Sequence, residues 1–153
     1  MRKIGTIENR YHVYMNDKKK FIIKFETENH TISIDNVKWF DENSEETLNF
    51  VADLILDDVV VGRCSNSGRG GNAAYYTNSE YHLLANNISQ EVSTIQNYSY
   101  PKNNENFCDV LDKLACLNVS FIENEVKTNI HAIAVINYFQ EIADEWRNRY
   151  TNK

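Results

Sequence analysis

Residues 44–61, SEETLNFVADLILDDVVV, decide the fold class, because the chain before them alternates at a period of two while this stretch spaces its apolar residues like a helix. Residues 43–46 supply a helix cap followed by acids, which suit the positive end of a helix dipole. The apolar residues that follow recur at helical intervals: Leu48, Val51, Ala52 and Ile55. We therefore expect a helix over residues 44–56 and a short buried strand at Val59–Val61.

The segment upstream of this stretch has the alternation of an antiparallel meander. Residues 6–15 are mostly apolar at odd positions, and Phe21–Phe25 repeats the pattern after the turn-forming Asn16–Lys18. Thr31–Ile34 has the pattern of a third strand. Such alternation predicts a sheet with one buried and one solvated face.

The segment downstream is dominated by helical spacing. Gly62–Asn72 is the only glycine-rich stretch and is expected to form a loop. Apolar stripes predict three further helices, over about residues 77–98, 105–117 and 128–153. Asn118 follows the second of them, where a left-handed residue would stop the helix.

These elements predict an α+β fold. We expect about three antiparallel strands, or four if Val59–Val61 joins them, packed against about four helices. No repeat or long linker divides the chain, so residues 1–153 are expected to form a single domain.

Composition predicts a soluble cytoplasmic protein. The net charge is −6 and the pI about 5.2, which opposes nonspecific attraction to nucleic acid or to an anionic membrane surface. No apolar run reaches the roughly 18 residues of a membrane span, and the first residues lack a secretory signal. Cys64, Cys108 and Cys116 form no CxxC pair, which favours a reducing compartment and argues against a disulfide or zinc site. We therefore expect no membrane partner and no direct nucleic-acid binding.

Acidic residues are concentrated in one segment, and this is the most informative functional signal. Residues 41–62 contain no Lys or Arg and carry these carboxylates: Asp41, Glu42, Glu45, Glu46, Asp53, Asp57 and Asp58. On a helix Asp53 and Asp57 would repel, and Asp58 would oppose the negative end of the dipole. Either the helix ends earlier, or the carboxylates serve to bind a partner with a basic surface, such as a nucleic-acid channel. A solvated acidic helix face is the alternative.

The Gly62–Asn72 loop carries a second signal. Its glycine amides could converge on an anion beside Arg63 and Arg69, but neither GxxxxGKS/T nor GxGxxG is present. The loop therefore fits a solvated surface loop, a phosphate cradle, or a partner contact in which Tyr75 and Tyr76 act as anchors.

Catalytic signatures are missing from the sequence. The four histidines, at positions 12, 30, 82 and 131, follow no metal-ligand spacing, and no GxSxG nucleophile motif occurs. We expect no enzymatic activity, no metal and no cofactor.

The sequence thus predicts a small acidic protein-binding module, an inhibitor of the immunity, antitoxin or phage anti-defence type, that occupies a basic surface of another protein. The residues expected to contact this partner are Asp41, Glu42, Glu45, Glu46, Asp53, Asp57, Asp58, Arg63, Arg69, Tyr75 and Tyr76. The alternative is a small nucleotide- or phosphate-binding protein that uses loop 62–72. Homo-oligomerisation through exposed aromatic residues is compatible with either.

Overall fold

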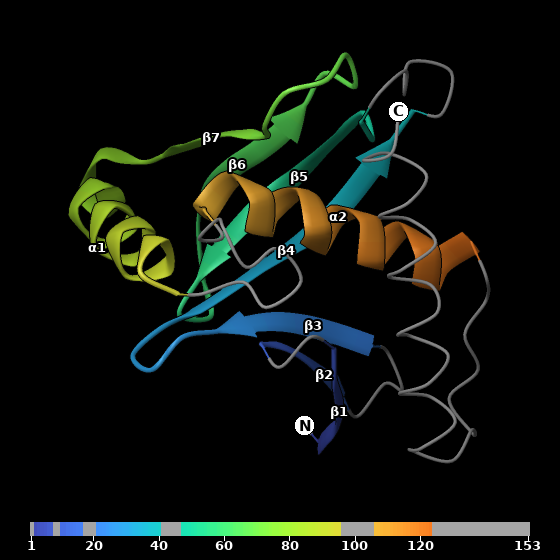
Figure 1. Ribbon diagram of the computed structural model, residues 1–153, viewed down its shortest axis with the longest axis horizontal. Coiled ribbons are helices and arrows are strands. Elements are labelled where there is room, and N and C mark those ends of the chain that lie inside the picture. The colour runs from blue at the N-terminus through green and yellow to red at the C-terminus, as the bar shows by residue number, and fades with distance from the viewer. Residues whose placement is uncertain (1, 8–9, 17–20, 41–46, 96–105, 124–153) are drawn as a thin grey trace.

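The chain folds around one antiparallel sheet in which successive strands are neighbours (Figure 1). The computed structural model describes residues 2–7, 10–16, 21–40, 47–95 and 106–123. The strands are β1 (Arg2–Ile7), β2 (Tyr11–Met15), β3 (Phe21–Glu26), β4 (Thr31–Trp39), β5 (Phe50–Leu56), β6 (Val59–Asn66) and β7 (Ala74–Thr77). The helices are a 3₁₀ turn, η2 (Ser79–Tyr81), followed by α1 (His82–Ser93) and α2 (Phe107–Glu123).

The predicted fold, three or four strands packed against about four helices, is wrong. The meander does not stop after β4 but continues to a seventh strand, and the described residues form only two α-helices. Within the expected helix over residues 44–56, Phe50–Leu56 form strand β5 instead, and the alternate side chains of this strand are fully buried. These buried side chains are Phe50, Ala52, Leu54 and Leu56. Because this run is apolar at almost every position, it fits a period of two as well as the helical spacing.

The acidic pair after β5 forms a turn, not a helix end. Asp57 and Asp58 have positive φ angles of 50° and 66° and join Leu56 to its partner Val59 as a two-residue hairpin loop. Two successive left-handed residues define the turn type that matches the twist of paired strands, and Asp tolerates it. The pair that looked costly on a helix is thus suited to a hairpin.

Other boundaries also differ from those expected. Gly62–Asn66 belongs to β6, so only the residues after it form a loop. The predicted stop at Asn118 is wrong, because its side-chain amide donates to the Leu114 carbonyl oxygen at 2.7 Å and α2 continues to Glu123. The helix expected over residues 128–153 lies outside the described residues.

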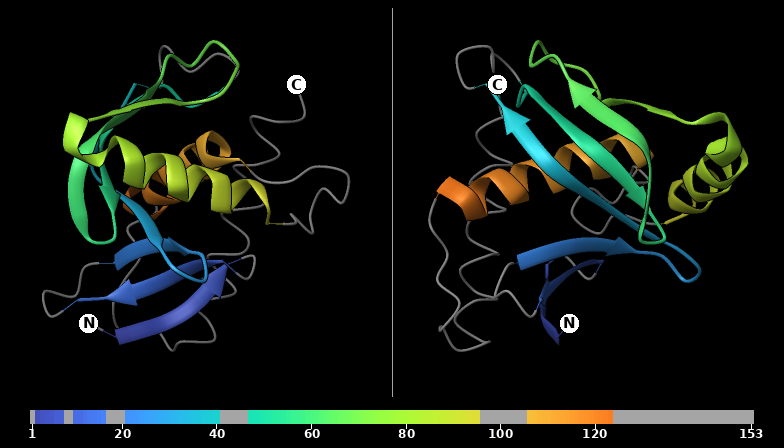
Figure 2. Two further views of the ribbon diagram at one scale, coloured as in Figure 1. Left: turned by 90° about the vertical axis from the view of Figure 1, so that its left-hand side faces the viewer. Right: turned by 180° about the vertical axis from the view of Figure 1, so that it is seen from behind.

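Helix α2 covers one face of the sheet (Figures 1 and 2). It packs against β3 and β4, and its predicted apolar stripe is confirmed as buried. That stripe comprises Phe107, Val110, Leu111, Leu114 and Leu117. Seen from behind, β4, β5 and β6 lie in front of α2, and no described element covers them from that side (Figure 2, right). The fold therefore leaves one face of β4–β7 open within the described part of the chain.

Candidate functional site

The uncovered side of β4–β7 presents an ordered set of side chains. Because Phe50, Ala52 and Leu54 point to the core, the residues between them on β5 point away from it. Cross-strand register aligns them with their neighbours in three rows. We name this surface the open face. It consists of Asp35, Asp53, Arg63 and Tyr76 in the central row, Lys38, Val51, Ser65 and Ala74 in the second, and Ile55 and Val60 in the third.

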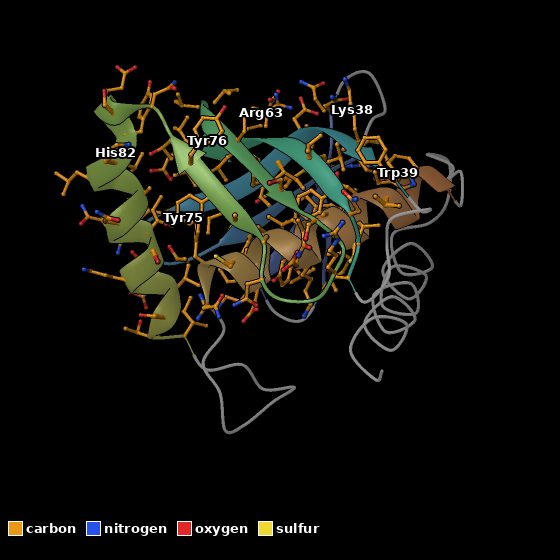
Figure 3. All side chains as sticks on the ribbon, turned by 90° about the horizontal axis from the view of Figure 1, so that it is seen from above. Lys38, Trp39, Arg63, Tyr75, Tyr76 and His82 are labelled. Atoms are coloured by element: carbon orange, nitrogen blue, oxygen red, sulfur yellow. The ribbon has the colours of Figure 1, made fainter. Side chains whose placement is uncertain are left out.

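The open face exposes large side chains on a rigid support. Tyr76 is 61% and Val60 58% exposed, and the Arg63 side chain is 52% exposed. Lys38, Arg63 and Tyr76 lie along the side of the sheet away from α2 (Figure 3). Tyr and Arg are the residue types that dominate protein–protein binding energies, and paired strands hold them at small entropic cost.

Three residues predicted from the sequence meet in the central row. Arg63 pairs with Tyr76 across β6–β7 and with Asp53 across β5–β6, where its Nε lies 4.0 Å from Asp53 Oδ1. Asp53 Oδ2 also accepts a hydrogen bond from Asn36 Nδ2 at 2.7 Å. Strand register, which spacing along the chain does not show, brings these groups together.

The remaining described carboxylates of the acidic segment are paired within the chain. Asp57 Oδ2 lies 2.8 Å from His30 Nδ1, and its Oδ1 accepts the Thr31 amide at 2.9 Å. Asp58 Oδ1 accepts a 2.6 Å bond from Lys24 Nζ. At these two residues the like-charge repulsion that suggested a basic partner is therefore offset by partners within the chain. The acids at positions 41, 42, 45 and 46 lie outside the described residues.

Tyr75 and Arg69 do not join the open face. Tyr75 points to the other side of β7 and packs edge-to-face on Phe107, with ring centroids 4.7 Å apart (Figure 3). Burial raises the pKa of its hydroxyl. Arg69 is exposed on the loop between β6 and β7.

That loop is held by a half-buried carboxylate on α2. Asp112 Oδ1 accepts a bond from Asn66 Nδ2 at 2.9 Å, and its Oδ2 accepts the Ala73 amide at 3.0 Å. Asn66 Oδ1 in turn accepts the Gly68 amide at 2.8 Å. The Gly68 and Ala73 amides thus already donate to internal acceptors, and the Asp112 carboxylate beside them would repel an anion. This geometry gives the phosphate-binding alternative no support.

Strands β1–β3 carry a separate group of hydrogen-bonded polar side chains on the same side of the sheet as the open face. Thr6 Oγ1 lies 3.1 Å from His12 Nδ1, and His12 Nε2 lies 3.3 Å from Glu26 Oε2. Glu26 also accepts a hydrogen bond from the Tyr14 hydroxyl. Burial, more than the nearby charges, lowers the pKa of His12. These polar side chains interact with one another. The candidate contact residues are therefore Arg63, Tyr76 and Val60 of the open face.

A surface cavity of about 310 Å³ lies away from the open face, between the β3–β4 hairpin and the end of α1. It is lined by Arg10, Glu28, Asn29, Glu91, Thr94 and Ile95. Glu91 accepts hydrogen bonds from the Asn29 amide at 3.2 Å and from its side chain at 3.4 Å. Hydrogen bonds from Thr27 and Asn29 lower the pKa of Glu91. These contacts tie the hairpin to α1.

The described residues form no metal-binding cluster, and the Cys64 thiol is not reactive. No three His, Cys, Asp or Glu side chains there gather around a point that could hold a metal ion. Burial raises the pKa of the Cys64 thiol to about 12, which keeps it protonated and unreactive at neutral pH.

Of the open face the sequence predicted only Asp53, Arg63 and Tyr76, and it missed the other members, among them Asp35, Lys38 and Val60. It also missed the half-buried Asp112. Alternation of Val51, Asp53 and Ile55 along β5 was the signal for the face, but it was masked by the helical spacing of the same residues. No family model matches the chain, and no curated protein or solved structure is significantly similar to it. Within the described residues, no helix has the length and apolar character that crossing a bilayer requires.

Proposed function

We propose that the chain is a protein-binding module that inhibits a partner protein by occupying its surface with the open face. The observation that carries this proposal is the exposure of Tyr76 and Val60 near Arg63: Tyr76 is its partner across β6–β7, and Val60 lies along β6 in the neighbouring row. Exposed apolar side chains around a cation have the composition of an interface centre. The module needs no catalytic group, metal or cofactor for this role.

The proposed partner is basic overall and offers a carboxylate within an apolar patch. The net charge of −6 attracts a basic protein over long range, and the acids at 41, 42, 45 and 46 supply much of it. At short range Arg63 pairs with the carboxylate while Tyr76 and Val60 fill the apolar patch. Steering and anchoring are thus assigned to different residues.

Photo-crosslinking tests which surface the partner contacts. A photoreactive phenylalanine analogue placed at Tyr76 or Val60 is expected to form a defined adduct in cells that contain the partner. The same analogue at Leu83, which is 72% exposed on α1, is the matched control and should form none. Equal or stronger capture from position 83 would reject the open face as the binding surface.

With the captured partner purified, Tyr76→Ala is expected to weaken binding at least tenfold, because a central aromatic anchor contributes about 1.4 kcal/mol or more. Leu83→Ala should change the dissociation constant less than twofold. Titration calorimetry measures both, and thermal unfolding verifies that both variants fold. A Tyr76→Ala dissociation constant within twofold of the wild type would contradict the proposal.

The steering role has its own test. Replacing Glu42, Glu45 and Glu46 with Gln removes three negative charges and is expected to slow association severalfold at low salt while leaving dissociation unchanged. The salt dependence of the association rate should flatten in parallel. Stopped-flow mixing measures both, and association rates equal to the wild type at every salt concentration would remove these acids from the mechanism.

A further inference from the structure

The central row of the open face is complementary to itself. Consider two copies stacked face to face, with a twofold axis parallel to the strands and midway between β5 and β6. Each β5 then faces the β6 of the second copy. Asp53 meets Arg63 of the second copy, and Arg63 meets its Asp53. The four charges alternate in sign around the axis, which is the favourable arrangement.

The outer positions of the rows agree with the same axis. Strand β4 faces β7 of the second copy, so Asp35 meets Tyr76, whose hydroxyl can donate to a carboxylate. In the third row Ile55 meets Val60, which buries the exposed valine against an aliphatic side chain. No like charges face each other in any row.

The charge pattern also selects this axis over its neighbours. An axis along β5 would set Asp53 against Asp53, and an axis along β6 would set Arg63 against Arg63. Either arrangement places like charges at the centre of the contact, which is destabilising. Of these three axes, only the one between the two strands pairs opposite charges without also setting like charges against each other.

We propose that, without its partner, the protein forms a twofold dimer through its open faces, so that self-association competes with partner binding. This inference rests on the proposed function, because it takes the open face to be the binding surface. The four strands, about 4.8 Å apart, and the three rows, about 6.7 Å apart, give a contact of roughly 400 Å² per copy. This is about 800 Å² in total, below the roughly 1,200 Å² at which stable specific interfaces begin, so the dimer is weak enough for a partner to displace it.

Charge reversal tests the dimer. Sedimentation equilibrium of the wild type is expected to show the mass rising from 17.8 kDa toward twice that value between micromolar and millimolar concentration. Asp53→Arg and Arg63→Asp should each weaken dimerisation at least tenfold, because each sets like charges together. The double variant Asp53→Arg/Arg63→Asp should recover the wild-type dissociation constant within about threefold, since the alternation is restored with opposite sign.

Two further variants control for folding and for surface charge in general. Val60→Glu on the open face should abolish the dimer, whereas Leu83→Glu on α1 should leave it unchanged. Thermal unfolding verifies that each variant folds. A wild type that stays at 17.8 kDa at millimolar concentration, or folded single variants that dimerise as well as the wild type, would overturn the dimer. A folded double variant that stays monomeric would do the same.

The dimer and the proposed function fail separately. A monomeric wild type that still crosslinks a partner from Tyr76 rejects the dimer alone. A dimer whose charge reversals behave as stated, in a protein whose partner crosslinks from Leu83, rejects the proposed binding surface alone.

Discussion

Gly62→Ala is expected to lower the free energy of unfolding by about 3 kcal/mol and to detach β7 from β6. A Cβ atom at position 62 would lie 2.0 Å from the Tyr76 carbonyl oxygen and 2.8 Å from Thr77 Cα. Both are backbone atoms of β7, so no side-chain rotation can relieve the overlap. The strand must move away, and the ladder between β6 and β7 is lost with it. Urea denaturation measures the stability, and hydrogen exchange of the Tyr75–Thr77 amides reports the detachment.

Gly71→Ala is the matched control for the same chemical change. Gly71 has a φ of +86°, and a Cβ there meets nothing within 4 Å, so its cost comes from backbone strain alone. We expect a loss of about 1 kcal/mol with β7 still protected. If the two substitutions cost the same, the close approach of β7 at Gly62 does not constrain the sheet. Because Tyr76 lies on β7, Gly62→Ala should also remove the anchor of the open face.

Asp112→Ala is expected to have the second large effect, and one that depends on pH. The substitution removes the acceptor of Ala73 N and one of the two acceptors of Asn66 Nδ2, which keeps its bond to the Gly71 carbonyl oxygen at 3.3 Å. The Ala73 amide and one hydrogen of the Asn66 amide group, both on buried residues, then lack a partner, which costs about 4 kcal/mol together. The full cost is expected at low pH, where the Asp112 carboxyl group of the wild type is protonated and uncharged.

The pH dependence follows from the environment of Asp112. Burial raises the pKa of this carboxyl from 3.8 to about 6, against the lowering effect of its hydrogen bonds from Asn66 and Ala73. Between those two values the folded chain holds a proton that the unfolded chain releases, so wild-type stability falls as the pH rises from about 4 to about 6. The loss is on the order of 3 kcal/mol. The variant lacks this loss, so the cost of Asp112→Ala should shrink from about 4 kcal/mol at pH 4 to about 1 kcal/mol at pH 7.

Urea denaturation of both proteins across this pH range checks the prediction. Taking the difference between wild type and variant cancels the titration of the other groups. Asp112→Asn is the isosteric control, because it keeps one acceptor and carries no charge. A difference that is constant from pH 4 to pH 7 would mean that Asp112 does not titrate as its burial requires. A negligible difference at pH 4 would mean that its hydrogen bonds do not hold the loop.

The type of an element could be predicted from the sequence where its apolar residues fit only one period, either the strand's or the helix's. The alternation of β3, with Ile23 and Phe25 buried, and the stripe of α2 from Phe107 to Leu117 follow from the geometry of a strand and of a helix. Residues 50–56 were misread because an almost continuous apolar run satisfies both periods. Hydrogen bonding to β4 and β6 on either side resolved the ambiguity in favour of a strand.

The candidate site shows the same division. Arg63 and Tyr76 were identifiable by residue type, since exposed Arg and Tyr suit an interface. Asp53 was also predicted, as one of the clustered acids, but its place beside Arg63 was not, because the two meet only through the register of β5 against β6.

The sequence by itself determined the alternation of the meander, the apolar stripe of α2 and the concentration of acid in one segment, because each of these is a property of neighbouring residues. The tertiary structure alone decided that β5 is a strand, that Asp57 and Asp58 pair with His30 and Lys24, and that one sheet face stays open. These outcomes depend on strand register and on the side of the sheet that α2 covers. Both are set by contacts between residues far apart in the chain, where the spacing of residue types carries no information.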